Sequence, residues 1–205
     1  MKMRQCCAAS ALTVLLGACS ILPKSEAPNI YLLPAAAATV TTPRATAQQS
    51  VRITTPHAAR ALDSARIAVV PRDNMITAYQ GARWSDRAPR LLRDRLLDAF
   101  RADGRFAASS SDDARLQADM ELTGDLRAFQ TEYSSGQPVV SIRYDAQLAD
   151  TRSQKIVGTR RFDIRQPVAG KQVPQVVVAF GQATDELSAQ VVAWVAATSP
   201  GTKSR

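Results

Sequence analysis

The amino-acid sequence predicts a single α/β (α+β) domain, in which an antiparallel-rich sheet with a meander is packed by two main amphipathic helices. In the middle of the chain, residues 116–128 and 140–148 are apolar or small at every second position, which is typical of strands with one buried face. Residues 85–104 and 174–197 instead repeat apolar side chains at spacings of three and four, which is typical of helices packed on a sheet. Short polar turns separate the alternating segments and predict that consecutive strands run antiparallel.

The N-terminus has the layout of a secretory signal that ends at a cysteine. A basic start with Lys2 and Arg4 precedes an uncharged, largely apolar stretch over residues 6–16, and the tetrapeptide Leu16-Gly17-Ala18-Cys19 follows. The apolar stretch is too short to remain as a membrane-spanning helix. Small residues directly before the cysteine allow a peptidase to approach the backbone.

From this layout we expect residues 1–18 to be a lipoprotein signal peptide and Cys19 to be the lipidation site, carrying diacylglyceryl and N-acyl lipid. The alternative is an ordinary signal peptide that contains a cysteine. Two or more acyl chains give stable anchoring. Ser20 stands where an aspartate would be the usual signal for inner-membrane retention, so we expect an outer-membrane anchor and a domain that faces the periplasm.

Composition argues against an enzyme, a metal site or a cofactor site. Cys6 and Cys7 lie in the expected signal and Cys19 is acylated, so the domain keeps no thiol for a disulfide, a metal or a nucleophile. The single histidine, His57, is expected in a solvent-facing loop; it cannot build a zinc site alone, and no Gly-x-Ser-x-Gly elbow is present. The formal net charge of +8 falls to +6 when the two basic residues of the signal leave. The arginines are scattered and match no nucleic-acid-binding motif.

The remaining elements are expected in the following order. A lipidated tether spans 19–28, strands span 29–33, 51–54 and 66–70, and Pro34, Pro56 and Pro71 end these strands. Residues 35–49 are rich in Ala, Thr and Pro and read as a loop. The first helix begins at an N-cap, Ser85, and ends at Gly104. A third strand of the meander spans 156–164, and residues 199–205 form a flexible tail.

The segment Asn74 to Trp84 is the best candidate for a contact with a partner or ligand. It is expected to be a loop that joins a strand to a helix, and Tyr79, Arg83 and Trp84 are the residue types that anchor interfaces. On this interpretation, Trp84→Ala impairs docking and leaves the fold intact. The alternative is that Tyr79 and Trp84 belong to the core and clamp the start of the helix.

Four carboxylates on the alternating strands are expected to be solvated rather than catalytic. Period-two spacing places the first three on one exposed face, and nothing indicates the burial that would tune a pKa. These residues are Asp119, Glu121, Asp125 and Asp145.

The ordered set of motifs resembles the ABC-type transport auxiliary lipoprotein family, whose members accompany MCE (mammalian-cell-entry-type) lipid transporters of Gram-negative bacteria. The motifs are the lipobox ending at Cys19, Tyr31-Leu32-Leu33, residues 66–71, residues 79–84 leading into the helix with Pro89 to Leu92, the strand 122–129, and the helix with residues 179–183 and Trp194. The resemblance implies that residues 29–198 form that family's domain on a lipid anchor. It implies no lipid-binding residue.

The resemblance further implies a non-catalytic role in moving phospholipid or a related lipid between membranes. The partners would be an MCE-domain protein with its permease and ATPase, which this chain would dock onto the outer membrane; the chain itself has no phosphate-binding loop. The alternatives are a non-catalytic lipoprotein of another envelope-assembly machine, and an enzyme that uses Ser or Asp. The charge-poor segment 174–197 makes a homo-oligomer a further expectation.

Overall fold

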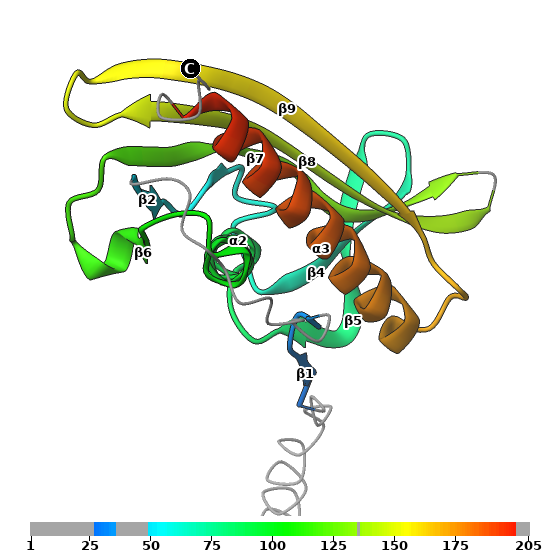
Figure 1. Ribbon diagram of the computed structural model, residues 1–205. Helices are drawn as coiled ribbons and strands as arrows, with labels where there is room; N and C mark the ends of the chain where they lie inside the picture. Colours follow the sequence, from blue (N-terminus) through cyan, green and yellow to red (C-terminus); the bar gives the residue numbers. More distant parts are fainter. Residues whose placement is uncertain (1–26, 36–48, 135, 200–205) are drawn as a thin grey trace, which may run out of the picture.

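The computed structural model describes residues 27–35, 49–134 and 136–199 (Figure 1). The elements are β1 (Asn29–Tyr31), β2 (Ser50–Ile53), β3 (His57–Ala58), β4 (Arg66–Arg72), β5 (Met75–Trp84), α2 (Ala88–Asp103), β6 (Ala108–Ser111), the 3₁₀ helix η1 (Asp112–Ala114), β7 (Met120–Ser134), β8 (Gln137–Asp150), β9 (Lys155–Pro167) and α3 (Val173–Thr198). The signal peptide, Cys19, most of the tether, most of the 35–49 loop and most of the tail lie outside the described residues.

The described strands form one mixed sheet organised around β7. One side of this strand pairs with β8 along its whole length, and β8 in turn pairs with β9, so these three strands form the antiparallel meander. The other side of β7 pairs in succession with β2, β3 and β4, all parallel to it. Further parallel pairs join β1 to β5 and β2 to β6. The α+β class and the two helices are confirmed, but the sheet is mixed rather than antiparallel-rich, because the short early strands cross over to lie parallel beside β7.

Both helices cover the same face of the sheet, with α3 running beneath β8 and β9 and α2 crossing below β7 (Figure 1). The α2 face carries Leu92, Leu96 and Phe100, which are fully or almost fully buried, and Arg95 of α2 pairs with Asp185 of α3. Most of the apolar side chains of α3 are buried too, so packing within the domain accounts for its low charge. In the described ranges, no helix has both the length and the hydrophobicity needed to cross a membrane.

The C-terminus of α2 lies where the sequence predicts it, whereas its N-terminus does not. Gly104 is the C-cap of α2, with φ 65° and its N–H donating to the carbonyl of Phe100. The N-cap is Arg87 rather than the expected Ser85, because Pro89 occupies the first turn, where its missing N–H costs nothing. The start of α3 is a capping box between Gln172 and Gln175.

The segment 74–84 is not the expected loop. It is β5, a ten-residue strand that forms an antiparallel hairpin with β4 through a turn in which Asn74 has φ 61°. The expected end of the preceding strand at Pro71 is also wrong, because β4 continues to Arg72. The proline is tolerated there because the register between the two strands shifts between Val69 and Arg72, where no ladder hydrogen bond is required of it.

Candidate functional site

A groove lies on β5 where a bulge interrupts its pairing with β4. Arg66 of β4 pairs with Arg83 of β5, and Ala68 pairs with Ala78. The two β4 residues are two positions apart, whereas their β5 partners are five positions apart. The extra residues leave the plane of the ladder, and Gly81 permits this with φ 65°. The hollow has a volume of about 670 Å³. We call it the edge groove; it is lined by Pro28, Ala61, Ala65, Arg66, Ile76, Thr77, Ala78, Tyr79, Gln80, Gly81, Ala82 and Arg83.

The edge groove lies at the border of the sheet that the N-terminal segment enters. β1 pairs only with Ala82 to Trp84 of β5, so residues 75–81 have no strand partner on that side within the described chain. Pro28, directly before β1, has no N–H with which to extend the pairing. Ile30, the strand partner of Arg83, is 67% exposed, and Leu32, just after β1, is 74% exposed. β1 and the end of β5 that pairs with it lie at the lower end of the molecule in Figure 1, and β9 runs along the opposite border.

The three candidate contact residues differ in their exposure to solvent. Arg83 is exposed and Tyr79 is half-buried, and both line the edge groove. Burial raises the pKa of Tyr79 to about 12. Trp84 is fully buried, which excludes its side chain from contact with a partner in this conformation. Of the two roles that the sequence leaves open for Trp84, the structure shows the core.

Trp84 is the aromatic centre that joins the sheet to α3. Its ring lies edge-on to Phe180 of α3 at 5.2 Å and to Phe129 of β7 at 6.2 Å. Phe129 and Phe180 are themselves 4.9 Å apart, so the three rings form one cluster. Because Trp84 and Arg83 are neighbours in a strand, the inward tryptophan fixes the outward direction of the arginine.

Arg83 belongs to a row of side chains that crosses three strands. It pairs with Ile30 of β1 on one side and with Arg66 of β4 on the other. Residues directly opposite in a sheet share a face, and this face is turned away from α3 because Trp84 occupies the other. The row therefore places one exposed apolar side chain and two arginines side by side. Ile30 and Arg66 were missed at the sequence level, because no local pattern brings β1, β4 and β5 together.

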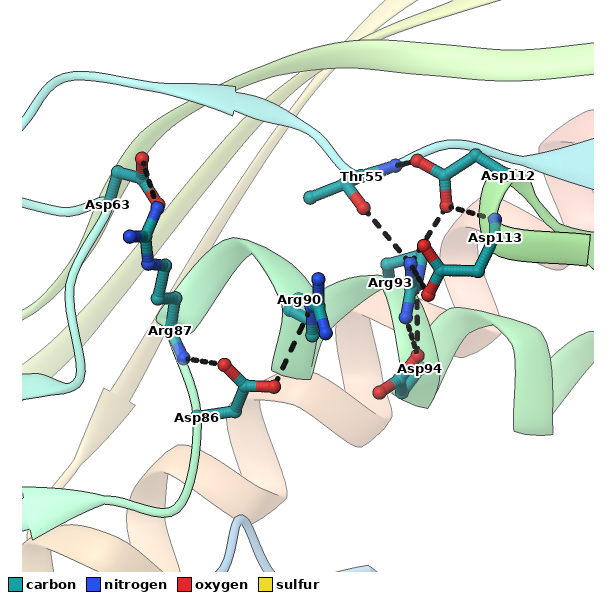
Figure 2. A network of polar contacts seen from close by, with 9 residues as sticks. All are labelled: Thr55, Asp63, Asp86, Arg87, Arg90, Arg93, Asp94, Asp112 and Asp113. Carbon is teal, nitrogen blue, oxygen red and sulfur yellow. Dashed lines mark hydrogen bonds and ion pairs between the residues drawn. The ribbon is translucent and has the colours of Figure 1, made fainter.

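A second polar cluster surrounds Arg93 of α2 (Figure 2). Its guanidinium donates to Asp112 at 2.8 Å, to Asp113 at 2.7 Å, to Asp94 at 2.7 Å and to the hydroxyl of Thr55 at 3.2 Å. The burial of the Asp112 carboxylate by itself raises the pKa of this group. Hydrogen bonds from Thr55 and Arg93 outweigh that effect and lower the pKa of Asp112 below its ordinary value. The cluster joins α2 to η1 and to the segment after β2, with its carboxylates committed to one arginine. We interpret it as structural.

The same face of α2 continues as a looser chain of ion pairs in Figure 2. Arg87 lies 3.3 Å from Asp63, and Arg90 lies 3.6 Å from Asp86. These pairs are exposed and contribute little.

The four carboxylates expected on the exposed face of the strands are each held by a partner. Asp145 accepts hydrogen bonds from Arg161 and Arg127, which lower its pKa, and Glu121 pairs with Arg52. Asp125 lies 3.0 Å from Arg127, and Asp119 accepts from Ser50.

His57 is solvent-facing as expected, although it lies in β3 rather than in a loop. In the part of the chain that the structure describes, no three His, Cys, Asp or Glu side chains are placed to hold a metal ion.

Comparison with known proteins identifies the family. The family described as ABC-type transport auxiliary lipoprotein component matches residues 31–192. The crystal structure of protein XCC0632 from Xanthomonas campestris, of family DUF330, has a TM-score of 0.75 at 28% identity and covers 83% of this chain and 96% of that chain. A second crystal structure, of an uncharacterized protein, shares the fold with a TM-score of 0.66 at 14% identity, over 83% and 99% of the two chains. No curated protein matches the chain significantly. Because the family match extends from β1 into α3, this chain belongs to the ABC-type transport auxiliary lipoprotein family.

Proposed function

We propose that this protein is a non-catalytic auxiliary component of an MCE-type lipid transport system. Acylated at Cys19, it is anchored in the outer membrane, faces the periplasm and docks the periplasmic end of the transporter there. Its direct partner is the MCE-domain protein, which acts with a permease and an ATPase. The family description, which names an auxiliary component of ABC-type transport and no reaction, supports this role.

The observation that carries the proposal is the position of the edge groove beside β1. Asn29 follows Cys19 by ten residues, and a fully extended chain of that length spans at most about 36 Å. The groove strand β5 is paired to β1, so an acyl chain on Cys19 keeps the groove near the membrane. A transporter docked at this border is brought to the membrane in which the lipid is to be inserted or from which it is taken.

The free side of β5 supports docking by strand addition. Residues 75–81 present backbone groups without a strand partner among the described residues, and Met75 and Ile76 are 37% and 42% exposed. An extended segment of the MCE-domain protein can pair with such an edge, with its side chains placed over the groove. Tyr79, which lines the groove, then provides a rigid wall for the incoming segment.

The test is an affinity purification from detergent-solubilised envelope with Cys19 intact, followed by mass spectrometry. We expect an MCE-domain protein, a permease and an ATPase in the eluate. Ile76→Asp places a charge on the groove wall and should lower recovery of the MCE-domain protein at least tenfold. Ile156→Asp is the matched control, because Ile156 is 59% exposed on β9 at the opposite border.

Each outcome separates one part of the proposal from another. Recovery of outer-membrane assembly components alone would support the alternative envelope-assembly role. Loss of the MCE-domain protein with Ile156→Asp but not with Ile76→Asp would move the docking surface to β9. Absence of acyl groups on Cys19, measured by the mass of the N-terminal peptide, would refute the anchor itself.

A further inference from the structure

The pairing of Arg66 with Arg83 is unusual for this sheet. On the meander, Arg143 is opposite Asp163 at 3.0 Å and Arg161 is opposite Asp145 at 2.6 Å, whereas Arg160 is opposite Ala146. Arg66 and Arg83 instead stand directly opposite each other in the β4–β5 ladder. Both are exposed, and neither has an acidic partner among the described residues. Like charges in this position repel and destabilise the pair of strands.

An anion between the two guanidinium groups removes this repulsion. Each guanidinium offers a planar set of N–H donors that matches the oxygens of a phosphate group. Their common face and direct opposition bring both sets of donors to one place. The chemistry of the pair therefore selects a phosphate or a similar oxyanion.

The surroundings of the pair select a phosphate that carries apolar chains. Ile30 is 67% exposed immediately beside Arg83, and Leu32 is 74% exposed two residues further along. Ala61 and Ala65, the latter next to Arg66 in the sequence, add small apolar side chains to the lining of the edge groove, which also includes Arg83. Inorganic phosphate has no apolar group to contact these side chains, whereas a phospholipid carries glycerol and acyl chains next to its phosphate.

The lipid anchor keeps the domain close to the phospholipids of the membrane that holds it. This step rests on the proposed acylation of Cys19, which holds β1 within about 36 Å of the bilayer surface. The tether lets the domain reach the bilayer surface, and arginines that come within a Debye length of an anionic surface, about 8 Å at physiological ionic strength, are attracted to its headgroups. Exposed apolar side chains beside them enter the boundary between headgroups and acyl chains.

We propose that Arg66 and Arg83 bind the phosphate of a bilayer phospholipid, with Ile30 and Leu32 at the acyl boundary, so that the β1/β5 border of the domain rests on the membrane. The edge groove then opens onto the bilayer at its Arg83 end. Its other end, at Ile76 to Gln80, stays available to the partner.

The test uses the acylated full-length mature protein in vesicles of phosphatidylethanolamine and phosphatidylglycerol with a trace phospholipid that carries a photoreactive headgroup. After irradiation, chymotryptic peptides are analysed by mass spectrometry. We expect the headgroup crosslink on the peptide that contains Arg83. The double variant Arg66→Gln with Arg83→Gln should lower this crosslink about 25-fold, the product of about a fivefold preference for an anionic surface from each cation. Arg101→Gln with Arg115→Gln, two exposed arginines outside the groove, is the charge-matched control and should change it little.

Three results would overturn the proposal. The first is an equal yield of the crosslink from the wild type and the groove double variant. The second is an equal crosslink on β9 peptides, which would mean that the β1/β5 border has no preference for the membrane. The third is loss of the crosslink in excess inorganic phosphate, which would show a site for a free anion. The mass of the acylated N-terminal peptide is measured in the same sample, so an absent anchor is distinguished from an anchored protein that does not contact headgroups.

Discussion

Removal of the Trp84 side chain should destabilise the fold rather than act first on docking. The side chain is fully buried and makes edge-to-face contacts with Phe129 and Phe180. Truncation of a buried tryptophan loses its transfer free energy and leaves a cavity, which together cost about 3–5 kcal/mol. We therefore expect Trp84→Ala to lower the free energy of unfolding by about 4 kcal/mol, out of the 5–15 kcal/mol typical of a domain. The corresponding fall in melting temperature is about 12 °C for a domain of this size.

The measurement is urea unfolding followed by far-ultraviolet circular dichroism. Trp194→Ala is the matched control, because Trp194 is half-buried and has one ring contact, with Phe162 at 5.8 Å. It should lose about 2 kcal/mol. Trp84→Phe keeps an aromatic ring and removes an indole N–H that has no acceptor among the described residues, so its cost should be only about 1 kcal/mol.

The opposite pattern would refute this reasoning. If Trp84→Ala changed the free energy of unfolding by less than about 0.5 kcal/mol, the value typical of surface substitutions, the side chain could not be the aromatic centre of the core. Loss of partner recovery in such a stable variant would restore Trp84 as a contact residue, which is what the sequence alone predicts as one of two roles.

Three further predictions concern the polar residues and the glycines. Arg93→Ala should cost about 2 kcal/mol at neutral pH, since it leaves Asp112 and Asp113 facing each other without a cation. Because the folded-state pKa of Asp112 lies below the ordinary 3.8, its contribution is present above that pH and is lost as the pH falls below it; unfolding measured between about pH 5 and about pH 2 should show a shallower loss in the variant. Arg83→Glu replaces a repulsive cross-strand pair with an attractive one, so it should raise the free energy of unfolding by about 0.5 kcal/mol in lipid-free solution. The same variant should abolish the headgroup crosslink. A lower free energy of unfolding would contradict the direct opposition of Arg66 and Arg83. Gly124→Ala should lower the free energy of unfolding by more than about 2 kcal/mol, because the new Cβ would lie 2.1 Å from the carbonyl oxygen of Asp145. Gly81→Ala has open space around it and should lower the free energy of unfolding by only about 1 kcal/mol, because of its positive φ. Equal losses of stability in thermal unfolding would contradict this difference.

Those parts of the fold that depend on local periodicity could be predicted from the sequence. The apolar stripe of α2 is buried where the three-and-four spacing places it, at Leu92, Leu96 and Phe100. The alternation along 140–148 also matches the buried face of β8. Along β7 the alternation of buried positions holds from Met120 to Ala128, but the next residue, Phe129, is buried too. The register with β8 shifts between Leu126 and Ala128, a feature that depends on the partner strand rather than on the local pattern.

The candidate site depends on pairing between distant segments and could be predicted only in part. Met75, Ile76 and Thr77 are consecutively exposed because β5 is at a border, so the segment lacks the alternation that marks a half-buried strand. Its aromatic and arginine residues are visible in the sequence, and of these Tyr79 and Arg83 line the groove. The opposition of Arg66 and Arg83 follows from the register of one hairpin, which its bulge changes by several residues. No spacing in the sequence reveals that register.

The bulge at Gly81 makes the two proposed activities of β5 separable. It divides the strand into a half that runs from Met75 to Gln80 with a free side, and a half from Ala82 to Trp84 that is paired to β1. If the first half binds the partner and the second rests on the bilayer, Ile76→Asp should reduce partner recovery without changing the headgroup crosslink, and Arg83→Gln should do the reverse. Sites without shared contacts act additively, so the double variant should show both losses at their single-variant sizes. A single variant that reduced both readouts would mean that one surface performs both tasks, with the partner and the headgroup competing for the same groove.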